Sequence, residues 1–581
     1  MILKDFKLDS EGFMGHYADL ITDVVIPYQE KILKDEIPGI EKSHALENFR
    51  LAAEYLKEGH CNGEFYGMVF QDSDVAKWLE AVAYSLLLKP DEKLSRKADE
   101  VIELIGSACH EDGYLNTYFT VKEPKRRYED LCEAHELYCA GHMMEAAVAY
   151  KEATGKGRLL DIMCKMADNI YENFVEADRE GYPGHPEVEL ALYRLYEATG
   201  KEKYKELADR FIDKRGVDSD FFINECKNRG WSVWNSDGSG KEYYLCHEPV
   251  RQQKEATGHA VRAVYLYSGM ADYAILNRDK EMKEACIRLW SNVVNKKMYV
   301  TGAIGSSYEG EAFTVDYHLP NDTAYAETCA AVGLVFFAKR MQKLDGHKGI
   351  YGDTMERALY NCVLSGMQQD GKRFFYVNPL EAVPGISGVA ATHRHALCER
   401  PEWFACACCP PNVARLITSV GEYAWTLEKD CIWSDLYVAG SLNTEFGKIT
   451  LSTDFPTEGS LKYSFDMKNG PRRFTLAIRI PYWSMNTVVS KNGEKLSPVV
   501  RDGYACIEDE FKDGDIIEVG LDMSVHRVYA NPKVSADSGR VCFMRGPLVY
   551  CAEEADNEGG VIGIGVYGSS EAVLSEQPDF Y

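Results

Sequence analysis

The chain has 581 residues, more than one ordinary hydrophobic core accommodates, so two or three domains are expected. Its formal net charge of −26 would repel phosphate backbones and anionic lipids, which argues against nucleic-acid and membrane partners. Hydrophobic residues make up 45% and charged residues 27%, and this balance is that of a soluble globular protein.

The cysteines indicate a reducing environment. There are 18 of them, scattered without the close regular spacing of a small disulfide scaffold. The first six residues, MILKDF, lack the basic start and apolar run of a signal peptide, and no stretch reaches the ~20 apolar residues of a membrane helix. We therefore expect a cytoplasmic protein, in which a cysteine cluster indicates metal binding or catalysis before it indicates a disulfide.

Residues 1 to about 425 are predicted to be helical. Segments 74–88, 136–153 and 187–198 carry apolar residues at helical spacing. The second and third segments both end in Ala-Thr-Gly-Lys, where Gly155 and Gly200 are placed to cap a helix C-terminus. A helix pair at an interval of about 45 to 60 residues is typical of a solenoid or of a closed ring of helical hairpins.

Three Gly-His pairs favour the ring over the solenoid. They stand at Gly141-His142, Gly184-His185 and Gly258-His259. In a closed ring the loops and helix ends converge on one end, where a pocket forms. The pattern therefore predicts an α/α barrel with histidines near its pocket, although a histidine at a helix end is also commonly a capping or satisfied core residue.

From about residue 430 the hydrophobic period changes from helical spacing to strict alternation. Residues 461–465 and 474–480 alternate apolar and polar side chains, and turn pairs such as Asn492-Gly493 separate these runs. We predict a helical domain over 1–428, whose first few residues can join the β part, and a β-sandwich domain over 429–581. The Gly- and Ser-rich tail 553–581 lacks periodicity, and we expect it to be poorly ordered.

Four side chains from two distant segments form a candidate metal site. Glu327 and Cys329 stand two apart before an apolar helix, and the adjacent Cys408 and Cys409 precede two prolines that favour a bend. Zinc takes Cys, His and carboxylate ligands in a tetrahedron and would hold the thiols as thiolates. A purely structural zinc site and simple burial of the cysteines are the alternatives.

Two further residues are candidates for the same pocket. Glu311 lies on a polar, irregular stretch, where an apolar surrounding would raise its pKa and let it donate a proton to a leaving group. Tyr376 can supply a hydroxyl group. The alternatives are a solvated loop glutamate and an ordinary buried tyrosine, and the role of Cys406 stays open.

At these residues the sequence resembles the bacterial β-L-arabinofuranosidases of glycoside hydrolase family 127. The resemblance spans most of residues 45–415. Its pieces are Asp72–Val75, Lys77–Glu80, Asp112–Tyr118, the three Gly-His pairs, Gly310–Phe313, Leu319–Tyr325, Glu327–Cys329, Tyr376–Leu380 and Cys406–Asn412.

The resemblance implies an (α/α)6 barrel followed by β-sandwich domains, and a retaining exo-glycoside hydrolase that releases β-L-arabinofuranose from arabinofuranosides or arabino-oligosaccharides. In such an enzyme Cys408 is the nucleophile and Glu311 is the acid/base. Zinc is bound by Glu327, Cys329, Cys408 and Cys409, and sugar by His142, His185, His259 and Tyr376. A homodimer is a weaker implication, because the chain looks shorter than better-known members at its C-terminus, where a final β-domain would be reduced or missing.

Three other interpretations remain open. The same fold and site can serve another furanoside or a branched sugar. A zinc-stapled protein can bind sugar without cleaving it, and an α/α-barrel epimerase or lyase can use the histidines for proton transfer. The position of Glu311 just upstream of the candidate ligands favours hydrolysis over the last two.

Overall fold

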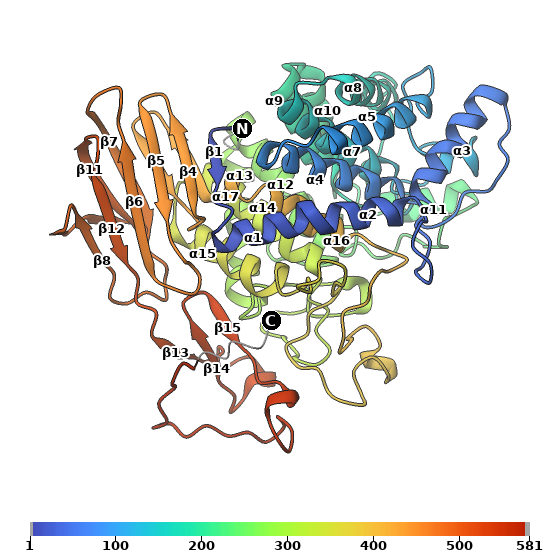
Figure 1. Ribbon diagram of the computed structural model, residues 1–581. Coiled ribbons are helices and arrows are strands. Elements are labelled where there is room, and N and C mark those ends of the chain that lie inside the picture. The colour runs from blue at the N-terminus through green and yellow to red at the C-terminus, as the bar shows by residue number, and fades with distance from the viewer. Residues whose placement is uncertain (1–3, 576–581) are drawn as a thin grey trace.

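The computed structural model describes residues 4–575 and consists of a helical N-terminal part followed by a β part (Figure 1). Among these residues, no helix is both long and apolar enough to cross a membrane. The helices of the N-terminal part are α1 Phe13–Leu20, η2 Ile21–Val25, α2 Ile26–Leu33, α3 Ala45–Glu58, α4 Asp72–Leu88, α5 Glu92–Ser107, α6 Tyr118–Val121, α7 Glu136–Thr154, α8 Arg158–Tyr171, η3 Glu172–Glu176, α9 Val188–Thr199, α10 Glu202–Lys214, α11 Phe221–Arg229, α12 Ala260–Asn277, α13 Lys280–Asn292, η4 Val293–Lys297, η5 Glu309–Glu311, α14 Thr328–Asp345, α15 Gly349–Ala358, η6 Leu359–Val363, η7 Ala391–His393, α16 Cys409–Thr418 and α17 Gly421–Ala424.

Six of these helices pack in a closed circuit. α4 contacts α7, α7 contacts α9, α9 contacts α12, α12 contacts α14, α14 contacts α16, and α16 contacts α4 again. α5, α8, α10, α13 and α15 pack outside this circuit. The sequence separates the two sets, because α4 and α7 are buried on all sides whereas α8 buries only a stripe that includes Leu159, Ile162, Met166 and Ile170.

The expected helix terminators act as predicted. Gly155 and Gly200 adopt left-handed backbone conformations, with φ of 78° and 69°. The backbone N–H of Gly155 donates to the Lys151 carbonyl, and that of Gly200 donates to the Tyr196 carbonyl, each one turn back.

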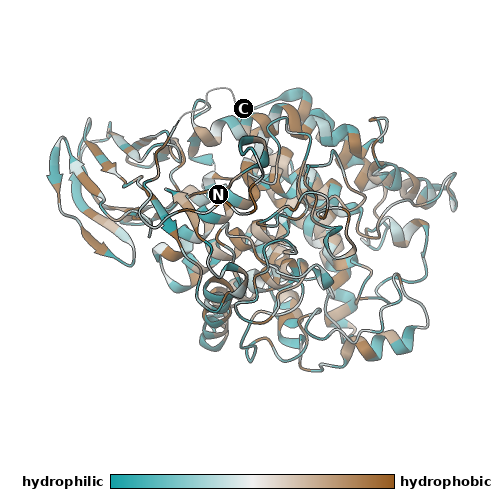
Figure 2. Ribbon diagram, turned by 90° about the horizontal axis from the view of Figure 1, so that it is seen from below, coloured by the Kyte–Doolittle hydropathy of each residue, from teal (hydrophilic) through white to brown (hydrophobic). Residues whose placement is uncertain are grey.

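Hydrophilic and hydrophobic segments alternate along the outer helices and the strands (Figure 2).

The β part contains three sheets. A seven-stranded sheet has the order β1-β4-β5-β6-β12-β8-β9, a five-stranded sheet has the order β10-β11-β7-β3-β2, and a small sheet has the order β13-β14-β15. The strands are β1 Phe6–Leu8, β2 Trp425–Glu428, β3 Cys431–Ser434, β4 Gly440–Thr444, β5 Gly447–Ser452, β6 Ser460–Asp466, β7 Arg472–Arg479, β8 Val488–Lys491, β9 Glu494–Leu496, β10 Val499–Arg501, β11 Tyr504–Phe511, β12 Ile516–Gly520, β13 Val525–Val528, β14 Cys542–Arg545 and β15 Leu548–Tyr550.

The two larger sheets face each other across a core of aromatic side chains. Phe465 of β6 lies with its ring centroid 4.4 Å from that of Phe511 on β11, and Phe474 of β7 lies 4.5 Å from the same ring. The predicted turn pair Asn492-Gly493 joins β8 to β9 with φ of 53° and 83°, as a type I′ hairpin requires.

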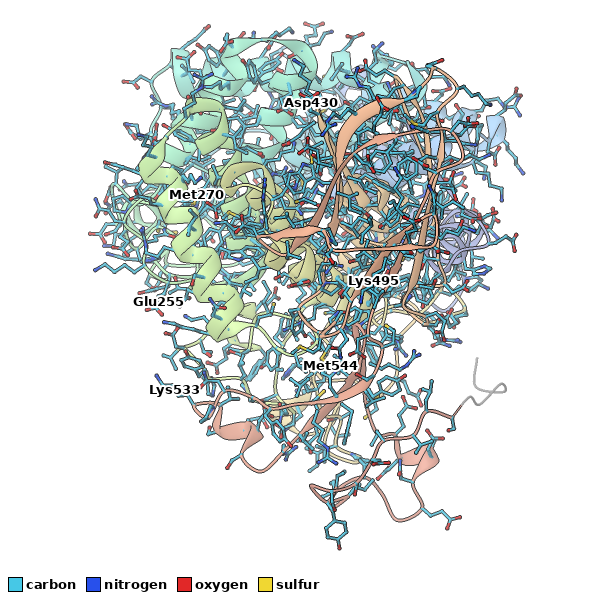
Figure 3. All side chains as sticks on the ribbon, turned by 90° about the vertical axis from the view of Figure 1, so that its left-hand side faces the viewer. Glu255, Met270, Asp430, Lys495, Lys533 and Met544 are labelled. Carbon is cyan, nitrogen blue, oxygen red and sulfur yellow. The ribbon has the colours of Figure 1, made fainter. Side chains whose placement is uncertain are left out.

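The β part begins slightly before its expected start at 429, because the change from helix to strand falls at Trp425. The first residues of the chain join the β part as expected, since β1 pairs with β4. The small sheet stands apart from the sandwich: Figure 3 shows Met544 of β14 well below Lys495 of β9. Residues 551–575 contain no strand, and the last six residues of the tail predicted to be poorly ordered lie outside the described range.

Candidate active site

The predicted site residues gather at a cavity of about 190 Å³. His185, His259, Glu311, Glu327, Cys329, Tyr376 and Cys408 all line it. Cys409 lies directly behind Cys329 and is fully buried. His142 is also fully buried and does not reach the cavity wall.

The four candidate metal ligands form a compact cluster. Cys329 Sγ lies 3.3 Å from both Cys408 Sγ and Cys409 Sγ, and those two sulfurs are 3.8 Å apart. Glu327 Oε1 lies 3.5 Å from Cys408 Sγ. A zinc–sulfur bond of about 2.3 Å gives a tetrahedron with edges of ~3.8 Å, so the four donors already stand close to the corners of such a tetrahedron.

Two helix N-termini create this cluster. Glu327 is the N-cap of α14 and Cys329 lies in its first turn, while Cys408 is the N-cap of α16 and Cys409 is its first residue. The prolines after Cys409 occupy the first turn, where the missing N–H groups cost nothing. The positive ends of both helices thus point at the sulfur cluster.

The donor set fits a zinc ion. Glu327 is fully buried and its Oε2 has no hydrogen-bond partner within the described part of the chain. Burial and the neighbouring Cys408 raise the pKa of Glu327 well above its ordinary value. A bound cation would satisfy this cluster of sulfur and carboxylate acceptors, and three thiols with one carboxylate suit zinc.

Glu311 is paired with a histidine in a fixed tautomer. The Val261 N–H donates to Nδ1 of His259 over 3.1 Å, so Nε2 carries the proton and donates to Glu311 Oε2 over 2.8 Å. Burial lowers the pKa of His259, which favours its neutral form. Glu311 and the preceding Gly310 both have left-handed backbone conformations, with φ of 52° and 68°, which turn the carboxylate toward the cavity.

The expected raised pKa at Glu311 is wrong. Burial does raise it, but the hydrogen bonds from His259 and Tyr325 outweigh burial and lower the pKa to about 2. The partner His259 comes from the start of α12, far from Glu311 in sequence. Its Nε2–H stabilises the carboxylate form, which an apolar pocket alone would not do.

The glycines of the Gly-His pairs are explained by close backbone approaches. A Cβ at Gly184 would lie 2.1 Å from the Cys132 carbonyl oxygen. A Cβ at Gly258, whose φ is 66°, would lie 1.9 Å from the Glu242 carbonyl oxygen. At both pairs the glycine lets the chain come close enough for the following histidine to face the cavity.

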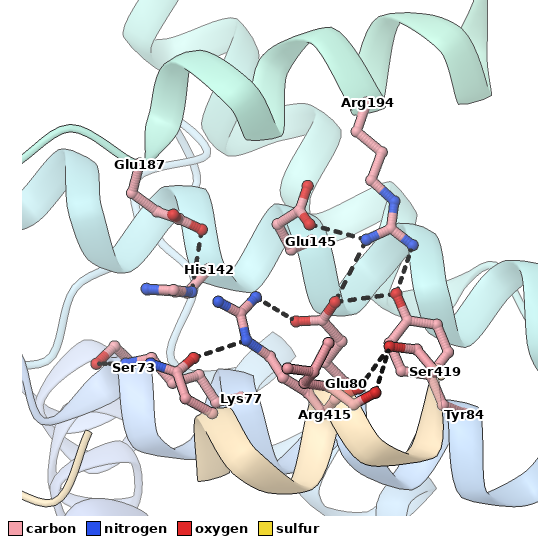
Figure 4. Close-up of polar contacts among 12 residues, drawn as sticks. Ser73, Lys77, Glu80, Tyr84, His142, Glu145, Glu187, Arg194, Arg415 and Ser419 are labelled. Carbon is pink, nitrogen blue, oxygen red and sulfur yellow. Dashed lines mark hydrogen bonds and ion pairs between the residues drawn. The ribbon is translucent and has the colours of Figure 1, made fainter. Parts of the chain in front are cut away.

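The remaining predicted sugar contacts divide into two kinds. His185 donates from Nδ1 to the Pro186 carbonyl over 2.8 Å, and Tyr376 places its hydroxyl 3.4 Å from Cys408 Sγ. His142 instead lies behind the wall, with Nδ1 3.0 Å from Glu187 Oε1 (Figure 4). Its ring packs 4.5 Å from that of Tyr138, which does line the cavity.

Sequence analysis missed several lining residues. They include His135, Tyr138, Trp234, Tyr243, Arg262 and Asn412. The segment after α11 offered one signal, since Trp231 and Trp234 are aromatic residues in an otherwise polar stretch, which is typical of a binding loop. Cys406 also lines the cavity, with its sulfur 3.7 Å from the Tyr376 hydroxyl.

Comparison with known families defines the class of protein. The model described as the β-L-arabinofuranosidase GH127 catalytic domain matches residues 7–422, the GH127 middle domain matches 431–523, and the family's C-terminal domain matches 525–577. The chain therefore belongs to glycoside hydrolase family 127 and is a glycoside hydrolase. Its final β-domain is present, contrary to the possibility that it is missing.

Individual relatives agree with this assignment. The chain is 40% identical to a non-reducing end β-L-arabinofuranosidase of Bifidobacterium longum subsp. longum, over 97% of this chain and 89% of the relative. A solved GH127 β-L-arabinofuranosidase from Geobacillus stearothermophilus is 49% identical, with a TM-score of 0.90 over 95% of this chain and 87% of that one. A GH127 β-arabinofuranosidase at 36% identity gives a TM-score of 0.84 over 96% and 85% of the two chains.

Proposed function

We propose that this protein releases β-L-arabinofuranose from the non-reducing end of arabinofuranosides or arabino-oligosaccharides. The observation that carries the proposal is one cavity bordered by both a clustered thiol, Cys408, and a loop carboxylate, Glu311. At about 190 Å³ the cavity is smaller than the ~300 Å³ at which pockets for drug-sized ligands begin, so it suits one sugar ring. The activities by which two of these relatives are named support L-arabinofuranose as that sugar.

Cys408 is the proposed nucleophile because of its position in the cluster. Cys329 and Cys409 are buried, whereas Cys408 is partly exposed at the cavity wall. Its sulfur attacks the anomeric carbon as the glycosidic C–O bond breaks, and Glu311 gives its proton to the departing oxygen. Glu311 then takes a proton from water, which attacks the same carbon, breaks the C–S bond and leaves the sugar with retained configuration.

Zinc is the proposed cofactor, held by Glu327, Cys329, Cys408 and Cys409. It would supply a Lewis-acid centre that keeps the thiols deprotonated at neutral pH. Three thiolates and one carboxylate contribute four negative charges, so the loaded cluster would carry a net charge of −2 beside Glu311. That charge is what would raise the pKa of Glu311 far enough for it to carry the proton needed in the first step.

The other residues of the site bind the sugar in this proposal. His185, His259 and Tyr376 present polar groups to the cavity. His142 contributes from behind the wall, through Tyr138. The phenol of Tyr376 also lies beside Cys408, so it aligns the attacking sulfur with the sugar.

We infer from the closed circuit of six inner helices that the helical part is an (α/α)6 barrel. All eighteen cysteines are free thiols, which supports a cytoplasmic setting in which they stay reduced. A homodimer is the proposed assembly, and size-exclusion chromatography with light scattering tests it.

A panel of nitrophenyl furanosides, covering both anomers of several pentoses, tests the activity. We expect release of nitrophenol from the β-L-arabinofuranoside and a loss of at least about 100-fold in Glu311→Gln when a natural oligosaccharide replaces the activated substrate. If the enzyme cleaves another furanoside faster, that sugar takes the place of L-arabinofuranose as the proposed substrate. Binding without cleavage by the wild type would contradict hydrolysis.

A further inference from the structure

Asn412 makes a contact with the sulfur cluster that the proposed ligand set does not include. Its side-chain Nδ2 lies 3.0 Å from Cys329 Sγ and 3.5 Å from the Tyr265 hydroxyl. Asn412 is buried in α16, three residues after Cys409, so both side chains project from the same face of that helix. The amide therefore stands immediately behind one of the thiols.

The orientation of this amide is fixed by a second residue on α16. Arg415 Nε donates to Asn412 Oδ1 over 2.7 Å. A guanidinium has only donors, so the oxygen of the amide must face Arg415 and the NH₂ group must face Cys329. An N–H group aimed at a sulfur is satisfied by a lone pair of that sulfur, and the interaction is stronger when the sulfur is a thiolate.

Arg415 is itself held rigidly inside the helical part. Its Nη1 donates to Glu80 Oε2 over 2.9 Å and its Nη2 donates to the Tyr265 hydroxyl over 3.1 Å. Arg194 approaches the other oxygen of Glu80 at 3.3 Å, as Figure 4 shows. The network joins α4, α9 and α16, so the amide is anchored to three of the inner helices.

We propose that Asn412, oriented by Arg415, is a positioning residue that donates a hydrogen bond to the Cys329 thiolate and thereby strengthens metal binding by the cluster. This inference rests on the proposed zinc site and adds a donor outside its four ligands. Groups that hydrogen-bond to metal ligands orient them and stabilise their ionised form. The segment from Cys408 to Arg415 then supplies two metal ligands, Cys408 and Cys409. It also supplies the hydrogen-bond donor Asn412 and, in Arg415, the residue that orients this donor.

The test is the dissociation constant of zinc, measured by competition with a chromophoric chelator on the full-length protein. We expect Asn412→Ala to weaken zinc binding about 10- to 100-fold. Asn412→Asp has nearly the same shape but places an acceptor against the sulfur, so it should weaken binding further. Arg415→Lys keeps the charge beside Glu80 and loses the fixed Nε–H, so a smaller loss in the same direction is expected.

The control is Asn48→Ala, which removes another fully buried asparagine with two hydrogen bonds, both to the backbone of Tyr66. It should lower the melting temperature and leave the zinc dissociation constant unchanged. Equal zinc affinity in Asn412→Ala and the wild type would overturn the inference while leaving the metal site intact, and an unchanged Arg415→Lys would overturn the part assigned to Arg415. A wild type that binds no zinc would overturn the metal site itself, and this inference with it.

Discussion

At the scale of single residues, the site works through pairs that the chain brings together from distant segments. His259 donates to Glu311, and the Tyr376 hydroxyl lies beside Cys408. In each pair one member reacts and the other sets its protonation or direction. The pairing with His259 lowers the pKa of Glu311, although burial of this carboxylate acts in the opposite direction.

Replacement of His259 by Ala should move the pH profile of kcat/KM. The hydrogen bond stabilises the carboxylate form of Glu311, so its loss raises the pKa of Glu311. Since Glu311 must be protonated in the first step, the basic limb of the profile should shift to higher pH, even though the rate falls overall. His185→Ala is the matched control, because His185 lines the same cavity and should lower the rate without moving that limb.

The residue types at the site could be predicted from the sequence, but their partners could not. The Glu-x-Cys and Cys-Cys pieces indicated a zinc cluster, and the geometry accommodates one. The pKa of Glu311 was predicted in the wrong direction, because no local pattern connects residue 311 with residue 259. His142 was expected to contact sugar, yet its fully buried ring supports Tyr138 from behind.

At the scale of secondary-structure elements, helix starts carry much of the chemistry. α14 and α16 begin at the metal cluster, and α12 begins at His259. α4 begins with Asp72, which accepts hydrogen bonds from the N–H and the hydroxyl of Thr117, 2.8 and 2.5 Å away. The carboxylate thereby ties the loop before α6 to the inner helices.

Asp72→Asn should remove a pH-dependent contribution to the free energy of unfolding. Burial raises the pKa of Asp72 from 3.8 to about 6, and the hydrogen bonds of Thr117 only partly oppose this. The folded state therefore binds the proton more tightly, so this contribution is fully stabilising below about pH 4 and is lost as the pH rises through 6. The free energy of unfolding of the wild type, relative to the variant, should fall by up to ~3 kcal/mol between those pH values.

Urea unfolding at several pH values measures that difference. The asparagine can keep both hydrogen bonds, because the threonine hydroxyl accepts as well as donates. A difference between the two proteins that does not change from pH 4 to pH 7 would show that Asp72 stays ionised in the folded state.

Element types were more predictable than their arrangement. The change of hydrophobic period located the β part to within a few residues, and the Ala-Thr-Gly-Lys pieces located two helix ends. The separate small sheet was not predicted, because β13, β14 and β15 are only three or four residues long. Strands that short give too few alternations to distinguish one sheet from the next.

At the scale of the whole molecule, the sandwich is locked to the helical part through a buried arginine. Arg479 at the end of β7 forms ion pairs with Asp353 and Glu356 of α15, and its Nε donates to the Asp435 carbonyl over 2.6 Å. Trp483 donates to the same Glu356 over 2.9 Å. The contact is dense enough that a Cβ at Gly352 would lie 2.4 Å from Arg479 Cδ.

Arg479→Leu should therefore destabilise the whole protein by about 3 to 5 kcal/mol, because it removes the cationic partner of the buried Glu356 and of the half-buried Asp353. The free energy of unfolding in urea measures the effect. Arg473→Leu is the matched control on the same strand, since its ion pair with Glu508 is exposed and should contribute less than about 1 kcal/mol. Equal effects of the two substitutions would mean that the Arg479 contact does not hold the two parts together.

The central claim is that the sulfur of Cys408 becomes bonded to the sugar. The most direct measurement is peptide mass spectrometry of Glu311→Gln after reaction with nitrophenyl β-L-arabinofuranoside, whose activated leaving group needs no proton donor. The water step still needs the missing base, so an anhydropentose should accumulate on the peptide that contains Cys408. An adduct on another residue, or steady turnover by Cys408→Ser, would contradict the account.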